Sequence, residues 1–521
     1  MTILRKYLFL FILIITVVSV NGSDSLRVKT FNCFRITDYR NLWSGTENMT
    51  GLIFTSTPNL VGVYAGMDDA DGSYHKTMDP SNYQTYSLST KSYKKIGKYT
   101  LYGGFAYNNL LEKGSRWNGT YDPYRGSPYI LGDSISNSIY RKENYSLTGG
   151  VATTLNEHLM IGCKIDYFVG VGAKQKDPRP LNTVVQFLFN PGIIWNKKSY
   201  NLGLDLGYLN RQEEISYLQN ITDNPDPAFY FFKGFGFYAK EIGTSYSRFQ
   251  SLSEYFGAIQ FEKKQNKNRL ISELRFKYGM EQINDGSSAV IKQYGGDWKA
   301  IDFRLNETAK FGENKKLHTL LISAGFFDGD GTEYTQDKVY KGNIAEYVTI
   351  AKNLKFNRRR ISGNLRHEFQ RLNDSGQLDW SVWSGLAFLS NEETYYYIPE
   401  IFTSKYTNLT GDLSLEKNLY VKSFHFAPRI SFSYVQNLNG TMLLSDLTEI
   451  TKKQMKDIYT ADFNYYAGNQ FKFSGQLVCG YFPVKIKHID QLFFSLDYTN
   501  LRSITLNDGF SVLSGKIGFI F

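Results

Sequence analysis

The stretch Phe424 to Tyr434, with the sequence FHFAPRISFSY, alternates between apolar and polar side chains. Its even positions hold Phe, Phe, Pro, Ile, Phe and Tyr, and its odd positions hold His425, Ala427, Arg429, Ser431 and Ser433. Successive side chains of a strand point to opposite faces, so one face of this strand is apolar and the other is polar. A tilted strand of about 9–11 residues crosses a bilayer, and membrane barrels alternate in this way. The stretch therefore predicts a membrane-spanning β-strand.

The composition agrees with many such strands. The 521 residues are 42% hydrophobic, 21% charged and 16% aromatic, which excludes a disordered chain and a helical membrane protein. The 39 Tyr and 38 Phe suit pleated surfaces and the aromatic girdles of membrane barrels. Beyond residue 22 the sequence has no apolar run of about 18 residues, so no transmembrane helix is predicted. Two classes of protein remain: a large soluble β protein and a membrane β-barrel.

The N-terminus is typical of an exported protein. Arg5 and Lys6 precede an apolar stretch, 7–20, and residues 20–22 (VNG) form a small-residue cleavage site. We interpret residues 1–22 as a signal peptide, with an uncleaved anchor as the alternative. The mature net charge of +8 (+10 minus Arg5 and Lys6) is spread along the chain, which argues against a nucleic-acid partner.

The connections between strand candidates alternate in length. Short turns are expected at 95–97, 156–158, 196–199, 312–316 and 416–418, and long polar loops at 112–143, 211–251, 284–297, 329–344 and 437–456. Short periplasmic turns and long extracellular loops are the rhythm of bacterial barrels, and a soluble sandwich has no such bias. The strand candidates, with 457–468 among them, predict an all-β fold: a transmembrane antiparallel β-barrel with an even number of about 16–20 strands.

The domain prediction has three parts. Residues 1–22 are the signal peptide, residues 23–50 an N-terminal segment able to tuck into the lumen as a plug, and residues 51–521 the barrel with long extracellular loops. A barrel with an export signal is expected in the outer membrane of a Gram-negative bacterium.

The polar faces of the strand candidates predict which side chains line the lumen. Both signs of charge point inward in this interpretation. The candidate lumen-lining residues are Lys164, Asp166, Glu273, Arg275, Lys277, Glu281, Asp302, Arg304, Arg366, Glu368, His425 and Arg429. Inward charges can select solutes along a hydrophilic path, or they can neutralise one another in a closed lumen.

A dense aromatic stretch lies inside the long loop 211–251. Exposed aromatic clusters often mark interaction surfaces, so the stretch is a candidate loop contact surface for a glycan, an apolar ligand or a surface lipoprotein. Its residues are Phe229, Tyr230, Phe231, Phe232, Phe235, Phe237 and Tyr238. The alternative is a hairpin folded into the barrel mouth.

Signals for metals, cofactors and catalysis are weak. The acidic stretches 68–72 (DDADG) and 328–331 (DGDG) lack the full calcium-loop pattern, and turn chemistry explains them. The sequence has no H-E-x-x-H, C-x-x-C, P-loop or G-x-S-x-G motif. We expect no metal, no cofactor and no enzymatic activity.

Several features together carry a family resemblance. The signal peptide, the patterned hairpins, the segment 190–193 (NPGI) and the terminal Phe521 resemble outer-membrane β-barrel proteins of Bacteroidota whose function is uncharacterised. The last strand, with Leu513, Ile517 and Phe519 on one face, resembles the terminal signal read by the barrel-insertion machinery. A weaker similarity, to hydrophobic-compound transport barrels and gliding-machinery barrels, rests on residues 41–51. Those families place an Asn-Pro-Ala-like segment in the lumen, where this chain has 48–50 (NMT).

Two functions follow from this interpretation. The first is a channel or transport component for a small solute. The second is a plugged structural barrel that anchors a surface-exposed or secretion complex through its loops. The expected partners are outer-membrane lipid and lipopolysaccharide, the insertion machinery and a surface lipoprotein.

Overall fold

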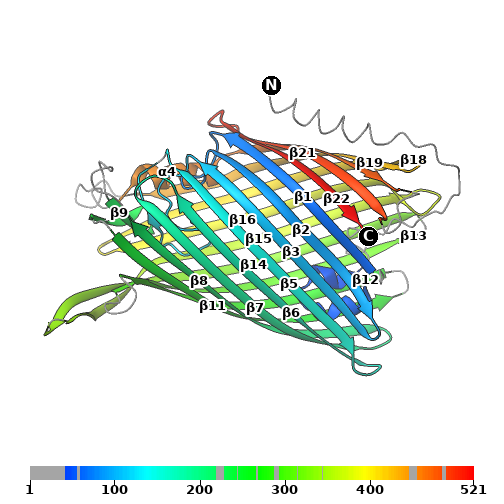
Figure 1. Cartoon of the computed structure of the whole chain (residues 1–521), viewed down its shortest axis with the longest axis horizontal. Coiled ribbons are helices and arrows are strands. Elements are labelled where there is room, and N and C mark those ends of the chain that lie inside the picture. Colours follow the sequence, from blue (N-terminus) through cyan, green and yellow to red (C-terminus); the bar gives the residue numbers. More distant parts are fainter. Residues whose placement is uncertain are drawn as a thin grey trace.

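The chain folds into a single closed β-barrel, seen from the side in Figure 1. This computed structural model describes residues 41–55, 59–135, 137–218, 228–242, 245–265, 268–286, 293–313, 315–342, 344–444, 454–483 and 489–521. The predicted signal peptide and residues 23–40 lie outside the described residues. Within the described residues, no helix is long and apolar enough to span a membrane.

The barrel wall is one antiparallel sheet of eighteen spanning strands in the described part of the chain. Its strands are β1 (Asn59–Gly72), β2 (Asn82–Ile96), β3 (Tyr99–Lys113), β5 (Ile139–Thr154), β6 (Leu159–Lys174), β7 (Arg179–Asn196), β8 (Tyr200–Leu218), β11 (Ser245–Gln265), β12 (Asn268–Asp285), β13 (Gln293–Glu313), β14 (Lys316–Lys341), β15 (Ile344–Leu372), β16 (Leu378–Tyr397), β17 (Glu400–Lys417), β18 (Leu419–Val421), β19 (Phe424–Leu443), β20 (Gln470–Tyr481), β21 (Gln491–Ser503) and β22 (Gly509–Ile520). The short β18 continues β17 along β19, so the nineteen labelled strands make eighteen spanning strands. β22 pairs with β1, with Ile520 opposite Gly62, which closes the barrel. The fold class and the even strand number are confirmed.

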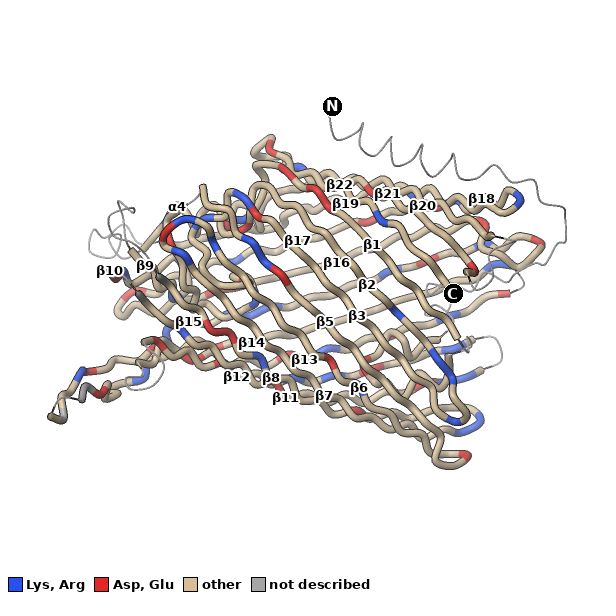
Figure 2. The backbone as a smooth tube through the Cα atoms, viewed as in Figure 1, with Lys and Arg blue, Asp and Glu red and all other residues tan. Residues whose placement is uncertain are grey.

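The alternation in β19 is repeated around the wall. Outward side chains such as Leu147, Phe189, Leu274 and Phe432 are large, apolar and exposed, which suits contact with hydrocarbon. Figure 2 shows the same pattern as long tan stretches on the front strands. Closure pairs the first and last strands of the described wall, so the sheet has no open side in lipid, where an unsatisfied backbone group costs several kcal/mol.

The two ends of the barrel differ in their connections. At the end that holds the C-terminus the turns are short, as between β2 and β3, and at the other end the connections are long (Figure 1). One expected long loop, 329–344, is instead a continuation of β14 and β15, which run for 26 and 29 residues. Both acidic stretches lie within strands, β1 and β14, and not in turns. In β14, Asp328 lies opposite Arg359 of β15, which supplies a partner of opposite charge.

Residues 457–468 were predicted as a strand, and this prediction is wrong. They form most of the helix α4 (Lys456–Ala467) at the end with long connections. Tyr and Phe favour strands, but tertiary packing overrides this weak preference. Ile458 is buried, and Asp462 accepts hydrogen bonds from the backbone N–H of Thr77 (2.7 Å) and the hydroxyl of Tyr124 (3.1 Å).

Candidate functional site: the lumen and its two closures

The lumen is lined by the inward faces of the strands. The register places all twelve candidate lumen-lining residues on these faces, because residues directly opposite each other on paired strands share a side of the sheet. Arg275 lies opposite Arg304, and Asp302 lies opposite Lys277, for example. Their outward neighbours Leu274, Phe276 and Phe303 are exposed on the lipid side.

Residues 41–55, which are the described part of the predicted N-terminal segment (41–50) and the first five residues assigned to the barrel, lie inside the lumen near the end of the barrel that holds the C-terminus. We call this stretch the luminal segment. It has two 3₁₀ turns, η1 (Leu42–Gly45) and η2 (Met49–Phe54). Asn41 and Asn48 cap them: their side-chain oxygens accept hydrogen bonds from the backbone N–H groups of Trp43 (3.1 Å) and Thr50 (3.2 Å). Asn41 also donates to the carbonyl of Gly51 at 2.9 Å, which joins the two turns.

Glycines in the wall make room for this segment. A methyl group at Gly162 on β6 would lie 2.7 Å from the backbone of Thr50. One at Gly192 on β7 would lie 2.2 Å from the amide oxygen of Asn48. Gly162 and Gly192 are paired in the sheet. The wall is therefore shaped to receive the segment, and any larger side chain at these positions would displace it.

Trp43 anchors the luminal segment to the wall at β11. Its side chain is 1% exposed, and its indole N–H donates to the Glu262 carboxylate on β11 at 2.7 Å. The same carboxylate accepts from Asn201 at 2.6 Å and pairs with Arg269. Because Glu262 has several partners, its burial is compensated in the way that buried charges require.

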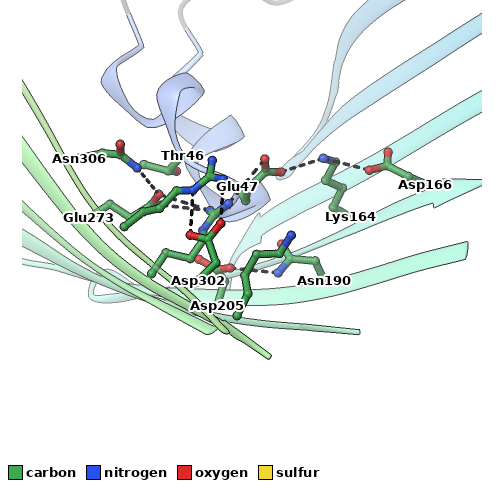
Figure 3. Close-up of polar contacts among 12 residues, drawn as sticks. Thr46, Glu47, Lys164, Asp166, Asn190, Asp205, Glu273, Asp302 and Asn306 are labelled. Carbon is green, nitrogen blue, oxygen red and sulfur yellow. Dashed lines mark hydrogen bonds and ion pairs between the residues drawn. The ribbon is translucent and has the colours of Figure 1, made fainter. Parts of the chain in front are cut away.

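Charged residues continue the contact toward the centre of the lumen (Figure 3). The Glu47 carboxylate is 2.9 Å from the Lys164 ammonium, which is also 3.0 Å from Asp166. Arg275 lies 3.7 Å from Glu47 and 3.3 Å from Glu273. These wall residues hold the segment by alternating charges.

The titration of Glu47 reflects this environment. Burial raises the pKa of its carboxyl, but the nearby charges of Lys164 and Arg275 lower it, and the net direction is below the usual 4.5. The carboxylate is therefore ionised, and its contact with Lys164 is formed, at neutral pH.

The opposite end of the lumen is closed by a small three-stranded sheet. We call β4 (Leu131–Gly132), β9 (Ala228–Gly234) and β10 (Phe237–Ile242) the mouth sheet. Within the predicted contact surface, Phe229, Tyr230, Phe231, Phe232, Phe235 and Phe237 are buried and Tyr238 is half-buried. The stretch folds into the barrel mouth, so the expected exposed surface is corrected to an internal core.

Aromatic partners from the wall and from α4 explain this burial. Phe237 stacks on Tyr395 of β16 with ring centroids 4.2 Å apart, and Phe235 stacks on Tyr459 of α4 at the same separation. The ring centroids of Phe229 and Tyr217 of β8 are 4.9 Å apart. Such ring pairs add to the free energy gained by removing apolar surface from water, which makes the buried hairpin favourable.

Buried ion pairs surround the mouth sheet. Arg248 and Asp285, on β11 and β12, form a two-point contact at 2.6 and 3.0 Å, and the Arg248 side chain is 2% exposed. Lys174 and Asp133 lie 2.9 Å apart with both side chains inaccessible. Pairing in this geometry offsets the cost of taking charges out of water.

The lumen contains two cavities. One cavity has a volume of about 590 Å³ and is bordered by Glu47, Lys91, Tyr93, Lys164 and Asp166. A second, on the facing wall, has a volume of about 310 Å³. The interior therefore holds polar cavities, the larger one beside the luminal segment, and the mouth sheet lies at the other end of the barrel.

The remaining lumen candidates lie outside the contact with the luminal segment. Lys277 lies 3.2 Å from Glu254, and Glu281 pairs with Arg125 from the connection before β4. Glu368 accepts a hydrogen bond from Gln370 at 2.7 Å.

His425 and Arg429 lie on β19. The His425 ring lies 2.8 Å from the Asn418 side chain. Arg429 pairs with Glu416 and lies over the Trp383 ring, and Arg366 lies over the same ring.

Sequence reasoning missed several important residues. Gly162, Gly192 and Trp43 shape the luminal contact, and Arg248 anchors the mouth. A signal existed for the glycines, since an isolated Gly inside a strand pattern often marks a close backbone approach. In the described ranges, no group of three or more His, Cys, Asp or Glu side chains is placed to hold a metal ion.

Comparison with known proteins identifies the family. The model of the family of unknown function DUF6850 matches residues 49–521. The chain belongs to the DUF6850 family. The match begins at Met49, the first residue of η2, so it covers part of the luminal segment and the whole described DUF6850 barrel wall. No curated protein matches the chain.

Solved structures with similarity to this DUF6850 protein are outer-membrane barrels. The ferric preacinetobactin receptor BauA of Acinetobacter baumannii has a TM-score of 0.43 and 8% identity, over 89% of this chain and 80% of that one. The copper transporter OprC has a TM-score of 0.41 and 8% identity, over 88% and 83%. A mutant of the monoaromatic hydrocarbon channel TodX has a TM-score of 0.31 and 9% identity, over 91% and 92%.

Proposed function

We propose that this protein is a gated transport barrel for a small polar solute in the outer membrane of a Gram-negative bacterium. The observation that carries the proposal is the polar, charge-lined lumen with its two closures, neither of which is a wall strand. A barrel with a purely structural role would gain free energy by packing its interior closely with side chains. A hydrated interior with inward charges instead suits passage of a solute.

The luminal segment has the properties of a movable closure. Its side chains Leu42, Trp43 and Leu52 pack against apolar residues of the wall. It also makes polar contacts, through Asn48, Glu47 and the Trp43 indole N–H, and their partners on the wall could return to water. Polar contacts of this kind contribute modestly to net stability because water competes for them. Release of the segment would therefore leave a wall that is still closed by its own backbone hydrogen bonds.

Conductance of the mature protein in planar bilayers tests this function. The double variant Gly162→Val, Gly192→Val blocks the groove of the luminal segment, and replacing residues 228–242 by a short Gly-Ser linker removes the mouth hairpin. We expect steady conductance only when both changes are combined. Gly149→Val is the matched control, because Gly149 on β5 is exposed and a Cβ there meets open space. Silence from a folded combined variant, checked by heat-modifiable mobility, would exclude transport through this lumen.

A structural anchor is the second candidate function. β14 and β15 extend as a two-stranded ribbon beyond the rest of the wall (Figure 1), and Val339, Tyr340, Val348 and Ile350 on it are exposed. An isolated two-stranded hairpin is marginally stable in water, which favours a partner on this ribbon. Shortening the ribbon would abolish partner capture by an anchor but would leave the conductance of the opened barrel unchanged.

A further inference from the structure

The 310 Å³ cavity on the facing wall has an unusual charge arrangement. It is lined by Arg304 on β13 and Arg360 on β15, and by the small residues Ser323 and Gly325 on the intervening β14 and Ser362 on β15. Gly325 lies opposite Arg304 on one side and opposite Ser362 on the other. Strands are about 4.8 Å apart, so the backbones of β13 and β15 are separated by roughly 10 Å. Two long guanidinium side chains can converge on one solute across this distance.

Arg360 has neutral neighbours on both adjacent strands. It lies opposite Phe327 on β14, with its guanidinium 5.8 Å from the ring centroid, and opposite Asn391 on β16. Its contact with the Asn391 amide oxygen is 3.5 Å long. Phe327 stands between Arg360 and Asp302 in this row. In the part of the chain that the structure describes, no carboxylate forms an ion pair with Arg360.

The neighbouring arginine on the same face, in contrast to Arg360, does form an ion pair. Arg358, two residues earlier and also inward, is 2.7 Å from the Glu393 carboxylate and donates to the carbonyl of Gly126 at 3.0 Å. Arg304 is held by Asp302 at 2.9 and 2.8 Å, yet its side chain is 59% exposed to the lumen. The cavity thus contains two guanidinium groups and one carboxylate, a net charge of +1.

We infer that this cavity is a binding site for a small solute that carries an oxyanion, with Arg360 as its principal contact. This inference rests on the proposed transport function and names its substrate class. A guanidinium matches carboxylate and phosphate oxygens with paired N–H donors, and the Ser323 and Ser362 hydroxyls can donate further hydrogen bonds.

A second inward arginine on β15 extends this site toward the end of the barrel that holds the C-terminus. Arg366 lies opposite Leu321 and Gly385, and among the described residues it has no carboxylate partner. Arg366 lies six residues after Arg360, about 20 Å along the strand. An anion that leaves Arg360 would find this second cation on the same wall.

Equilibrium dialysis of the purified mature protein in an uncharged detergent tests the site, with radiolabelled citrate and inorganic phosphate as separate probes. We expect saturable binding of one probe that weakens at least tenfold in Arg360→Gln and in Arg304→Gln. Arg359→Gln is the matched control, because Arg359 is the next residue of the strand and lies opposite Asp328 and Glu392 on the other face of the sheet. It should bind as the wild type does.

The outcomes separate this inference from the transport proposal. Equal binding by wild type and Arg360→Gln, or no saturable binding of either probe, overturns the oxyanion site whatever the conductance shows. Binding that depends on Arg360 in a protein whose opened variant does not conduct supports the site and rejects transport. A preference for citrate over phosphate assigns the solute to the carboxylates, and the reverse assigns it to the phosphates.

Discussion

The two sides of the lumen treat their charges in different ways. On the wall of β5–β8, β11 and β12, which we call the segment wall, Glu262 and Glu273 are buried and bonded to neighbours or to the luminal segment. On β13–β17, which we call the open wall, Arg304 and Arg360 are exposed to the lumen. The difference teaches that inward charge alone does not define a pathway. What distinguishes these charges is burial, since Glu262 and Glu273 are covered by other groups, whereas Arg304, although paired with Asp302, stays open to the lumen.

The largest expected effect separates buried from exposed arginines on the two walls. Arg248→Met on the segment wall leaves Asp285 buried without its ion-pair partner, which costs about 3–5 kcal/mol. Arg366→Met on the open wall removes a guanidinium that water solvates and should cost less than about 1 kcal/mol. The temperature at which the folded, fast-migrating form is lost on gels measures both effects.

Equal shifts in that temperature would break the comparison between the walls. In Arg248→Met, the added variant Asp285→Asn serves as the control. Removing the orphaned charge should restore part of the lost stability, whereas a simple loss of packing around Arg248 would not be rescued.

A local effect, confined to the luminal segment, is expected at its anchor. Trp43→Ala removes a buried indole, and truncations of this kind cost about 3 kcal/mol or more. Amide hydrogen exchange in residues 41–55 should become about 100-fold faster, while the wall strands keep their protection. Trp380→Ala is the control, because Trp380 is 41% exposed at the outer surface. Slow exchange retained in Trp43→Ala would mean that the polar contacts alone hold the segment.

The smallest effect is a pH dependence of opposite sign at the two closures. The pKa of Glu47 is lowered, so the stability from its ionised form is present above the usual 4.5 and is lost as the pH falls through the lowered pKa. Burial raises the pKa of Asp462 in α4 from the usual 3.8, although hydrogen bonds from Thr77 and Tyr124 oppose this shift. Its contribution is present at low pH and is lost as the pH rises through the raised pKa.

Hydrogen exchange at pH 4 and pH 7, corrected for the intrinsic rate, measures this dependence. Acidification should loosen residues 41–55 and tighten residues 456–467. Glu47→Gln should remove the response of the first segment, and Asp462→Asn that of the second. A change of the same sign in both segments would contradict the assignment to these two carboxyl groups.

Local patterns of the chain predict the wall well. The alternation in Phe424–Tyr434 is realised in β19, and the same period places all twelve candidate side chains on inward faces. Such predictions hold because a strand's period of two is set by local backbone geometry. The strand predicted at 457–468 fails because the segment forms a helix whose Tyr459 stacks on Phe235 in the turn of the mouth sheet and whose Tyr466 stacks on Tyr406 of β17.

The alternation of side chains by itself determined a membrane barrel with an apolar exterior and a charged interior. It could do so because lipid and water act on each strand separately. Only the tertiary structure decided which charges are satisfied, since Glu262 meets Trp43 across 219 positions of sequence and Phe237 meets Tyr395 across the mouth. Those contacts depend on the closure of the sheet, which brings remote residues into one lumen. The same closure leaves Arg360 facing the lumen beside neutral neighbours.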